Sequence, residues 1–63
     1  MFKIIKQKDG EVVSINTNLV RYLIKEGADT VIVFEETRIK VSANISKFTR
    51  FLNSKDLRFE YRH

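Results

Sequence analysis

The sequence predicts an α+β fold in which a small antiparallel sheet carries one amphipathic helix on a face. Residues 44–52 have the pattern of an Asn-capped amphipathic helix, and residues 57–63 alternate apolar and charged side chains as a half-buried strand does. Before them, two β-rich runs are each followed by a polar turn and a returning run, which is the pattern of two hairpins. We therefore predict one domain over residues 1–63, whose sheet contains two hairpins and the C-terminal strand.

The first predicted hairpin begins with residues 2–7, an aromatic and β-branched run typical of a strand. The pair Asp9-Gly10 follows and suits a tight turn, because glycine adopts a positive φ without strain. Residues 11–15 return as the second strand. Val13 and Ile15 lie on one face of that strand and Val12 on the other, so we expect another chain to cover one of the two apolar faces.

Residues 16–27 fit two patterns. The first is a short helix capped by residues 16–18 and ended by Gly27, with apolar side chains at helical spacing, namely Leu19, Val20, Leu23 and Ile24. The second is a turn followed by a strand, in which Val20, Tyr22 and Ile24 alternate with Arg21 and Leu23. Both remain open for residues 17–26, and the strand is favoured.

The second hairpin is predicted from residues 30–35, a β-branched and apolar run that suits the central strand of a sheet. Residues 35–37 form a polar turn, and residues 38–42 return with Ile39 and Val41 inward. Asn44 then caps a helix whose wet face is Ser46, Lys47, Thr49 and Arg50, and whose apolar stripe is Ile45, Phe48, Phe51 and Leu52. The predicted core is Phe34, Val31 or Val33, Ile39, Val41, Phe48, Leu52 and Phe59.

The amino-acid composition limits the ways in which so small a chain can be stabilised. A domain of 63 residues has a thin stability margin, which disulfides, a structural metal or self-association usually supplement. The chain has no Cys, and its single His, His63, cannot build a zinc site. We therefore expect a homodimer, no metal and no cofactor. The lack of Cys is typical of the cytoplasm, and residues 31–34, the longest apolar run, are too few for membrane insertion.

Positive charge is concentrated in the C-terminal part of the chain. Residues 37–63 hold seven Lys and Arg against two Asp and Glu, whereas residues 1–36 hold five against six. On the predicted elements the outward cations of this part form a candidate basic binding face, which consists of Lys47, Arg50, Arg58 and Arg62. The interleaved rings Phe48, Phe51 and Phe59 fall on core faces, so we expect few of them to stack on nucleic-acid bases.

No group of residues has the pattern of a catalytic site. Nucleophilic or acid–base catalysis needs a base beside a nucleophile, or two carboxylates held in a pocket. His63 lies at the end of the chain with no Ser placed beside it by any motif, and the carboxylates occur at turns. We predict that the protein is not an enzyme.

The order of apolar and turn residues resembles the FlbD (SwrD) family of small bacterial flagellar-motility proteins, over nearly the whole chain to about Leu52. The shared features are a strand directly after Met1, Gly10 in the first turn, Asn16 shortly before Leu19-Val20, Asp29-Thr30 opening a strand and Val41 closing the second hairpin. The chain departs from the family pattern at Ile4-Ile5, at Ala28 and at residues 35–37. The resemblance implies a non-enzymatic accessory that works through protein contacts.

From Ile15 onward the chain is also similar to the first part of LytTR-type DNA-binding domains. Those domains run strand, strand, helix and then an aromatic and basic strand, and Arg58, Phe59, Arg62 and His63 occupy the corresponding positions here. This similarity implies a nucleic-acid-binding regulator. Our main hypothesis is a small cytoplasmic adaptor or regulatory module that binds proteins, and the alternative is a regulator that binds nucleic acid through the basic C-terminal face.

Overall fold

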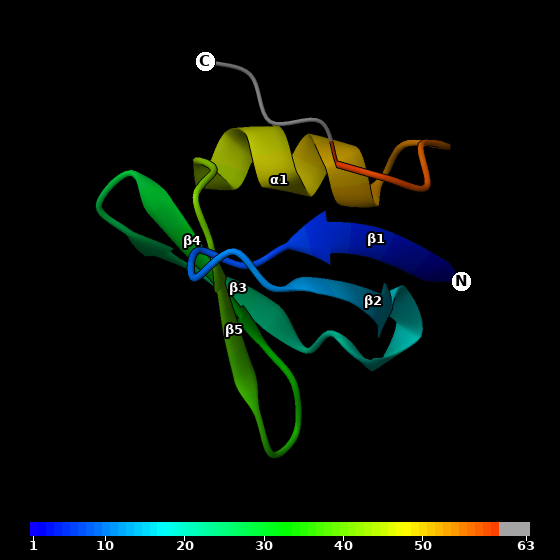
Figure 1. Cartoon of the computed structure of the whole chain (residues 1–63), viewed down its shortest axis with the longest axis horizontal. Coiled ribbons are helices and arrows are strands. Elements are labelled where there is room, and N and C mark those ends of the chain that lie inside the picture. Colours follow the sequence, from blue (N-terminus) through cyan, green and yellow to red (C-terminus); the bar gives the residue numbers. More distant parts are fainter. Residues whose placement is uncertain (60–63) are drawn as a thin grey trace.

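The computed structural model describes residues 1–59 and confirms the α+β fold class. The elements in chain order are β1 (Phe2–Lys6), β2 (Val12–Asn16), the 3₁₀ turn η1 (Thr17–Leu19), β3 (Tyr22–Glu26), β4 (Asp29–Val33), β5 (Arg38–Val41) and α1 (Ile45–Leu52). They form two antiparallel sheets, β1-β2 and β3-β4-β5, rather than the single sheet predicted. Helix α1 lies across the strands and packs on them (Figure 1).

The β1-β2 hairpin follows the prediction from Asp9-Gly10. Gly10 has φ +98°, which a glycine adopts at little cost, and the Asp9 carboxylate accepts from the Glu11 backbone N–H at 2.9 Å. Lys3 pairs with Ile15 and Ile5 with Val13, and this face of the hairpin turns toward the core. On the other face Phe2 and Val12 are exposed. That another chain covers this face stays a prediction.

Residues 16–27 contain a turn and a strand, which confirms the favoured alternative. The Asn16 side chain accepts from the Asn18 N–H at 3.1 Å and caps η1. Strand β3 then pairs with β4, and Gly27 makes the connecting turn at φ +61°. Leu23 packs against the core, whereas Tyr22 on the opposite face is exposed.

Strand β4 is the central strand, as predicted, and it is buried on both faces. Ile32 is fully buried between Leu23 of β3 and Ile39 of β5, its partners in register. Val31 and Val33 are buried on the opposite face. Because both faces are apolar, the alternation of the sequence gives no indication of which one meets the helix.

The C-terminal strand differs from the prediction in the described residues. Residues 57–59 make one isolated parallel bridge, between Ile4 and Arg58, instead of a strand of the sheet. Two backbone bonds hold the bridge: Ile4 N–H donates to Leu57 O at 2.7 Å, and Phe59 N–H donates to Ile4 O at 3.0 Å. Phe59 packs on the core, whereas Leu57 is exposed. The remaining residues of the predicted strand, 60–63, lie outside the described residues.

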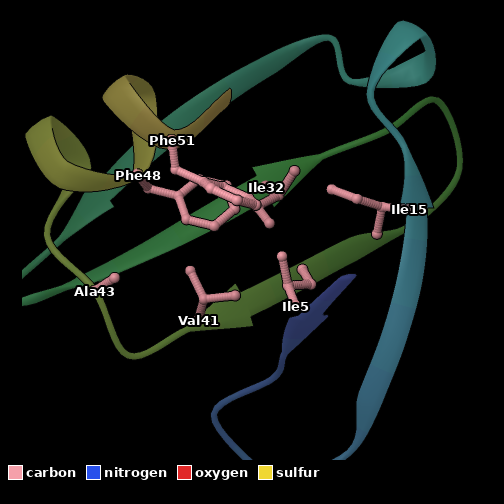
Figure 2. Close-up of a cluster of buried hydrophobic side chains, with 7 residues drawn as sticks. All are labelled: Ile5, Ile15, Ile32, Val41, Ala43, Phe48 and Phe51. Atoms are coloured by element: carbon pink, nitrogen blue, oxygen red, sulfur yellow. The ribbon is translucent and has the colours of Figure 1, made fainter. Parts of the chain in front are cut away.

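The core lies between α1 and the two sheets. Figure 2 shows its buried members, which are Ile5, Ile15, Ile32, Val41, Ala43, Phe48 and Phe51. Val41 and Phe48 confirm the predicted core, and four other predicted residues, Phe34, Ile39, Leu52 and Phe59, pack against it while half-buried. The predicted core omitted Ile5 and Ile15, because it assigned the first hairpin to a surface shared with another chain. It omitted Ile32 because it placed Val31 or Val33, on the other face of β4, toward the core.

Two ion pairs join neighbouring segments at the surface. Lys8 pairs with Asp29, which links the first hairpin to β4, and Lys40 pairs with Glu26 on the outer face of the second sheet. The hydrogen bond and the charge of Glu26 raise the pKa of Lys40. Because the pKa is higher in the folded chain, the pair's contribution to stability is present below the ordinary lysine pKa and is lost as the pH rises through the raised value. Within residues 1–59, no helix is long and apolar enough to cross a membrane.

Candidate basic binding face

Three of the four predicted basic residues meet at one pocket. The pocket has a volume of about 280 Å³ and is lined by Lys47, Arg50, Phe51, Ser54, Asp56, Arg58 and Phe59. The fourth predicted residue, Arg62, lies outside the described part of the chain. We call the pocket lined by these seven described residues the basic pocket. Among residues 1–59, the side chains that line the pocket carry a formal charge of +2, from three cations and the carboxylate of Asp56.

The basic pocket is formed where the end of α1 meets the Ile4–Arg58 bridge. Lys47 and Arg50 are three residues apart and therefore lie on one face of the helix. The bridge to β1 fixes Arg58 and Phe59 beside that face. One half of the pocket thus comes from α1 and the other from residues 58–59, and β1 is the strand that holds the second half in place.

Ser54 orders the turn between the helix and the bridge. Its hydroxyl donates to Phe51 O at 2.7 Å and accepts from the Asp56 N–H at 3.1 Å. The backbone N–H of Ser54 also donates to Phe51 O, at 3.1 Å. The hydroxyl is therefore committed to the turn, and the polar groups left to contact a ligand are the three cations and Asp56.

The aromatic rings below the cations pack against one another. Ring centroids lie 5.6 Å apart for Phe48 and Phe51, 5.5 Å for Phe48 and Phe59, and 5.1 Å for Phe51 and Phe59. Phe48 is fully buried, and Phe51 is 6% exposed. Phe48 and Phe51 therefore belong to the core, as predicted, and offer no open face on which a base could stack, while Phe59 packs against the core half-buried. They give the pocket an apolar floor.

Lys3, which is not among the predicted site residues, supports this floor from below. Its side chain is 1% exposed, and its ammonium donates to Phe51 O at 2.7 Å and Ser54 O at 2.8 Å, and more weakly to Leu52 O at 3.4 Å. The ammonium also lies 4.7 Å from the centroid of the Phe51 ring. Two features of the sequence hint at this role: Lys3 shares a strand face with Ile5, and no glycine follows the helix to cap its carbonyls.

No known family is matched: comparisons with protein-family models, with curated proteins and with solved structures find nothing similar to this chain. The resemblances to the FlbD and LytTR families stay predictions. Among residues 1–59 there is also no group of three or more His, Cys, Asp or Glu side chains placed to hold a metal ion.

The position of Lys47 within α1 is unfavourable for the helix itself. It is the third residue of the helix, after the Asn44 cap, where the macrodipole and free N–H groups favour a negative charge. Lys47→Glu should therefore raise the free energy of unfolding by about 0.5–1 kcal/mol, because a glutamate there also completes a capping pair with residue 44. Urea denaturation measures the change, with Lys25→Glu on β3 as a control of equal charge. A decrease would contradict this assignment and would mean that Lys47 contributes to folding.

Proposed function

We propose that this protein is a non-catalytic adaptor or regulatory module of the cytoplasm that acts by binding other proteins. The observation that carries the proposal is a set of six large apolar side chains, each at least half exposed: Met1, Phe2, Val12, Leu19, Tyr22 and Leu57. Single exposed apolar residues, such as Tyr22 on β3, are ordinary on protein surfaces, but a group of them marks an interaction site. On the FlbD resemblance alone, we extend the proposal to a role in bacterial motility.

Four of the six surround the beginning of β1. Phe2 is its first residue, and Met1 directly precedes it. Thr17 N–H donates to Met1 O at 2.8 Å, which brings the η1 residue Leu19 to one side. On the other side, Ile4 N–H donates to Leu57 O. We call Met1, Phe2, Leu19 and Leu57 the β1 end patch. All four are 56–62% exposed. A protein partner that covered them would remove this apolar surface from water, at about 25 cal/mol per Å².

Photo-crosslinking in cells of the host tests this proposal. A photoreactive phenylalanine analogue at position 2 should give a discrete protein adduct that is lost when Leu57→Ser is added. The same analogue at position 22, which is exposed on the other sheet, is the matched control and should not give that adduct. Identical adducts from both positions, or none from position 2, would contradict protein binding through the β1 end patch.

A second copy of the chain is the partner that we propose for β2. Backbone hydrogen bonds join Gln7 to Glu11 and Met1 to Thr17, and in an antiparallel pair such bonds occur at every second residue. Val12 and Ser14 occupy the positions in between, so their N–H and C=O groups point away from β1. In the described part of the chain these groups have no partner. Edge strands usually carry charges that oppose pairing, as β3 and β5 do here, but residues 12–16 have none.

Sedimentation equilibrium at micromolar concentration should therefore show a dimer. If two β2 strands pair antiparallel about Ser14, each Ser14 faces the other, and Ser14→Lys would place two like charges side by side. That variant should sediment as a monomer, and Ser42→Lys, an exposed change at the end of β5, should stay dimeric. A monomeric wild type at high concentration would overturn the homodimer.

Nucleic-acid binding is the second candidate function, favoured by the meeting of three cations at the basic pocket. Lys and Arg side chains that contact phosphates release counterions, so the affinity would fall steeply as salt rises. This function uses the basic pocket, whereas the adaptor function uses the β1 end patch.

A further inference from the structure

The three cations of the basic pocket are not used by the fold. Within residues 1–59, the side chains of Lys47, Arg50 and Arg58 form no ion pair or hydrogen bond, although Asp56 lines the same pocket. Lys47 also stands at the helix position least favourable for a cation. Arg50, in contrast, lies in the last turn of α1, where a cation is favourable. Three unpaired cations at one pocket, one of them unfavourable for its own helix, are typical of a binding site, where function takes precedence over local stability.

The floor of the basic pocket determines what kind of acidic ligand fits. Phe51 and Phe59 line it beneath the cations, so an occupant meets apolar surface as well as positive charge. A volume of about 280 Å³ is at the small end of ligand pockets and suits one or two side chains. A ligand with an apolar side chain and neighbouring negative charges would match both features.

Nucleic acid matches these features less well. Base stacking requires a whole exposed ring face, whereas an apolar side chain needs contact only with the parts of Phe51 and Phe59 that line the pocket. Phe51 is 6% exposed, and its ring packs against Phe48 and Phe59. The carboxylate of Asp56 also lies among the cations, where it would repel a run of phosphates. Carboxylates spaced along a peptide can approach the cations individually, and Arg binds them with two parallel hydrogen bonds.

We infer that the basic pocket binds a short acidic segment of a partner protein, which inserts a large apolar side chain against Phe51 and Phe59 and places carboxylates on Lys47, Arg50 and Arg58. The inference rests on the proposed function, since it assigns the chemistry of a protein partner. It concerns a different surface from the β1 end patch. The crosslinking result at position 2 and the peptide result below can therefore fail independently.

Fluorescence anisotropy with defined probes tests the inference on the full chain. The probe is a labelled synthetic peptide in which a Phe-Leu pair is flanked by Asp and Glu residues, and its matched control has Ser-Gly in place of Phe-Leu. At about 0.15 M salt we expect the probe to bind with a micromolar Kd. The control peptide should bind about tenfold more weakly, since it keeps the charges but loses the apolar contact.

The protein variants separate the pocket from general charge. Lys47→Glu combined with Arg58→Glu should weaken binding of the probe by at least about tenfold, because each change replaces an attractive group with a repulsive one. Lys25→Glu combined with Arg38→Glu makes the same change in net charge on exposed residues of β3 and β5 and should leave the Kd within about twofold. Circular dichroism and a urea midpoint check that each variant is folded.

Three results would overturn the inference. The first is no binding of the probe by the wild-type chain. The second is equal loss of affinity in the two double variants, which would mean attraction by net charge alone. The third is tighter binding of a labelled mixed-sequence oligonucleotide, single-stranded or duplex. In that case Lys47→Glu with Arg58→Glu would weaken this binding and lower its salt dependence by about two phosphate contacts. That third result would assign the basic pocket to nucleic acid.

Discussion

Replacing Phe48 with Ala should lower the free energy of unfolding by about 3–5 kcal/mol. The ring is fully buried and contacts both Phe51 and Phe59, so its removal leaves a cavity between α1 and the sheets and ends both ring contacts. A domain of 63 residues has a total stability of only about 5 kcal/mol or little more. We therefore expect most of that stability to be lost.

Urea denaturation followed by circular dichroism measures this loss. Thr49→Ala, an exposed change at the next position of α1, is the matched control and should shift the stability by no more than about 0.5 kcal/mol. If Phe48→Ala is unfolded without denaturant, Phe48→Leu gives a measurable intermediate loss, because it leaves a smaller cavity. A loss below about 1 kcal/mol for Phe48→Ala would contradict the position of this ring in the core.

The elements that the sequence predicted best are those fixed by neighbouring residues. Helix α1 follows from the Asn44 cap and a stripe of apolar residues three and four apart, and both signals lie within the helix. The turn at Asp9-Gly10 is equally local, since it depends on one glycine that accepts a positive φ. For the same reason Lys47 and Arg50 were correctly placed on one exposed helix face.

The features that the sequence did not predict depend on contacts between distant residues. The division into two sheets is one, because period-two alternation identifies strands without showing which strands pair. The bridge between Ile4 and Arg58 is another, since it joins two ends of the chain with no local signal. That bridge is also what brings Arg58 to Lys47 and Arg50. From the sequence, these three cations could therefore be predicted to lie together only if the helix and the last strand were assumed to be neighbours.

Lys3 is the clearest case of a residue whose role comes from the tertiary structure. A lysine in a strand is ordinarily exposed, because burial of an ammonium costs several kcal/mol unless polar groups replace its water. Here the replacement is the C-terminal end of α1, whose last carbonyls have no partner within the helix and carry partial negative charge. A single side chain of β1 thus anchors the helix, the turn at Ser54 and the aromatic floor of the basic pocket.

Lys3→Met should consequently destabilise the fold by about 2 kcal/mol. The methionine keeps most of the apolar stem but removes the charged donor from the carbonyls of Phe51 and Ser54. Phe51 O keeps the hydroxyl and the N–H of Ser54, whereas Ser54 O has no other donor within residues 1–59. Lost hydrogen bonds to a charged group cost about 1.5–3 kcal/mol. Contact with the Phe51 ring adds to the loss. The opposing effect is that methionine removes the free-energy cost of burying an ammonium. In other proteins, this effect makes the replacement of buried charged side chains by apolar ones neutral or favourable for stability.

We expect the loss to exceed the relief, because the ammonium has three carbonyl acceptors for its three N–H groups and is therefore well solvated by the protein. Urea denaturation of Lys3→Met decides between the two, with Lys25→Met on an exposed position of β3 as the control. Peptide binding at the basic pocket should weaken together with stability, since the floor residue Phe51 loses its anchor. Unchanged or increased stability would mean that the cost of burying the ammonium is the larger effect. The helix end would then be held by the backbone N–H of Asn53, which donates to Thr49 O at 3.1 Å, and by Ser54, which donates to Phe51 O.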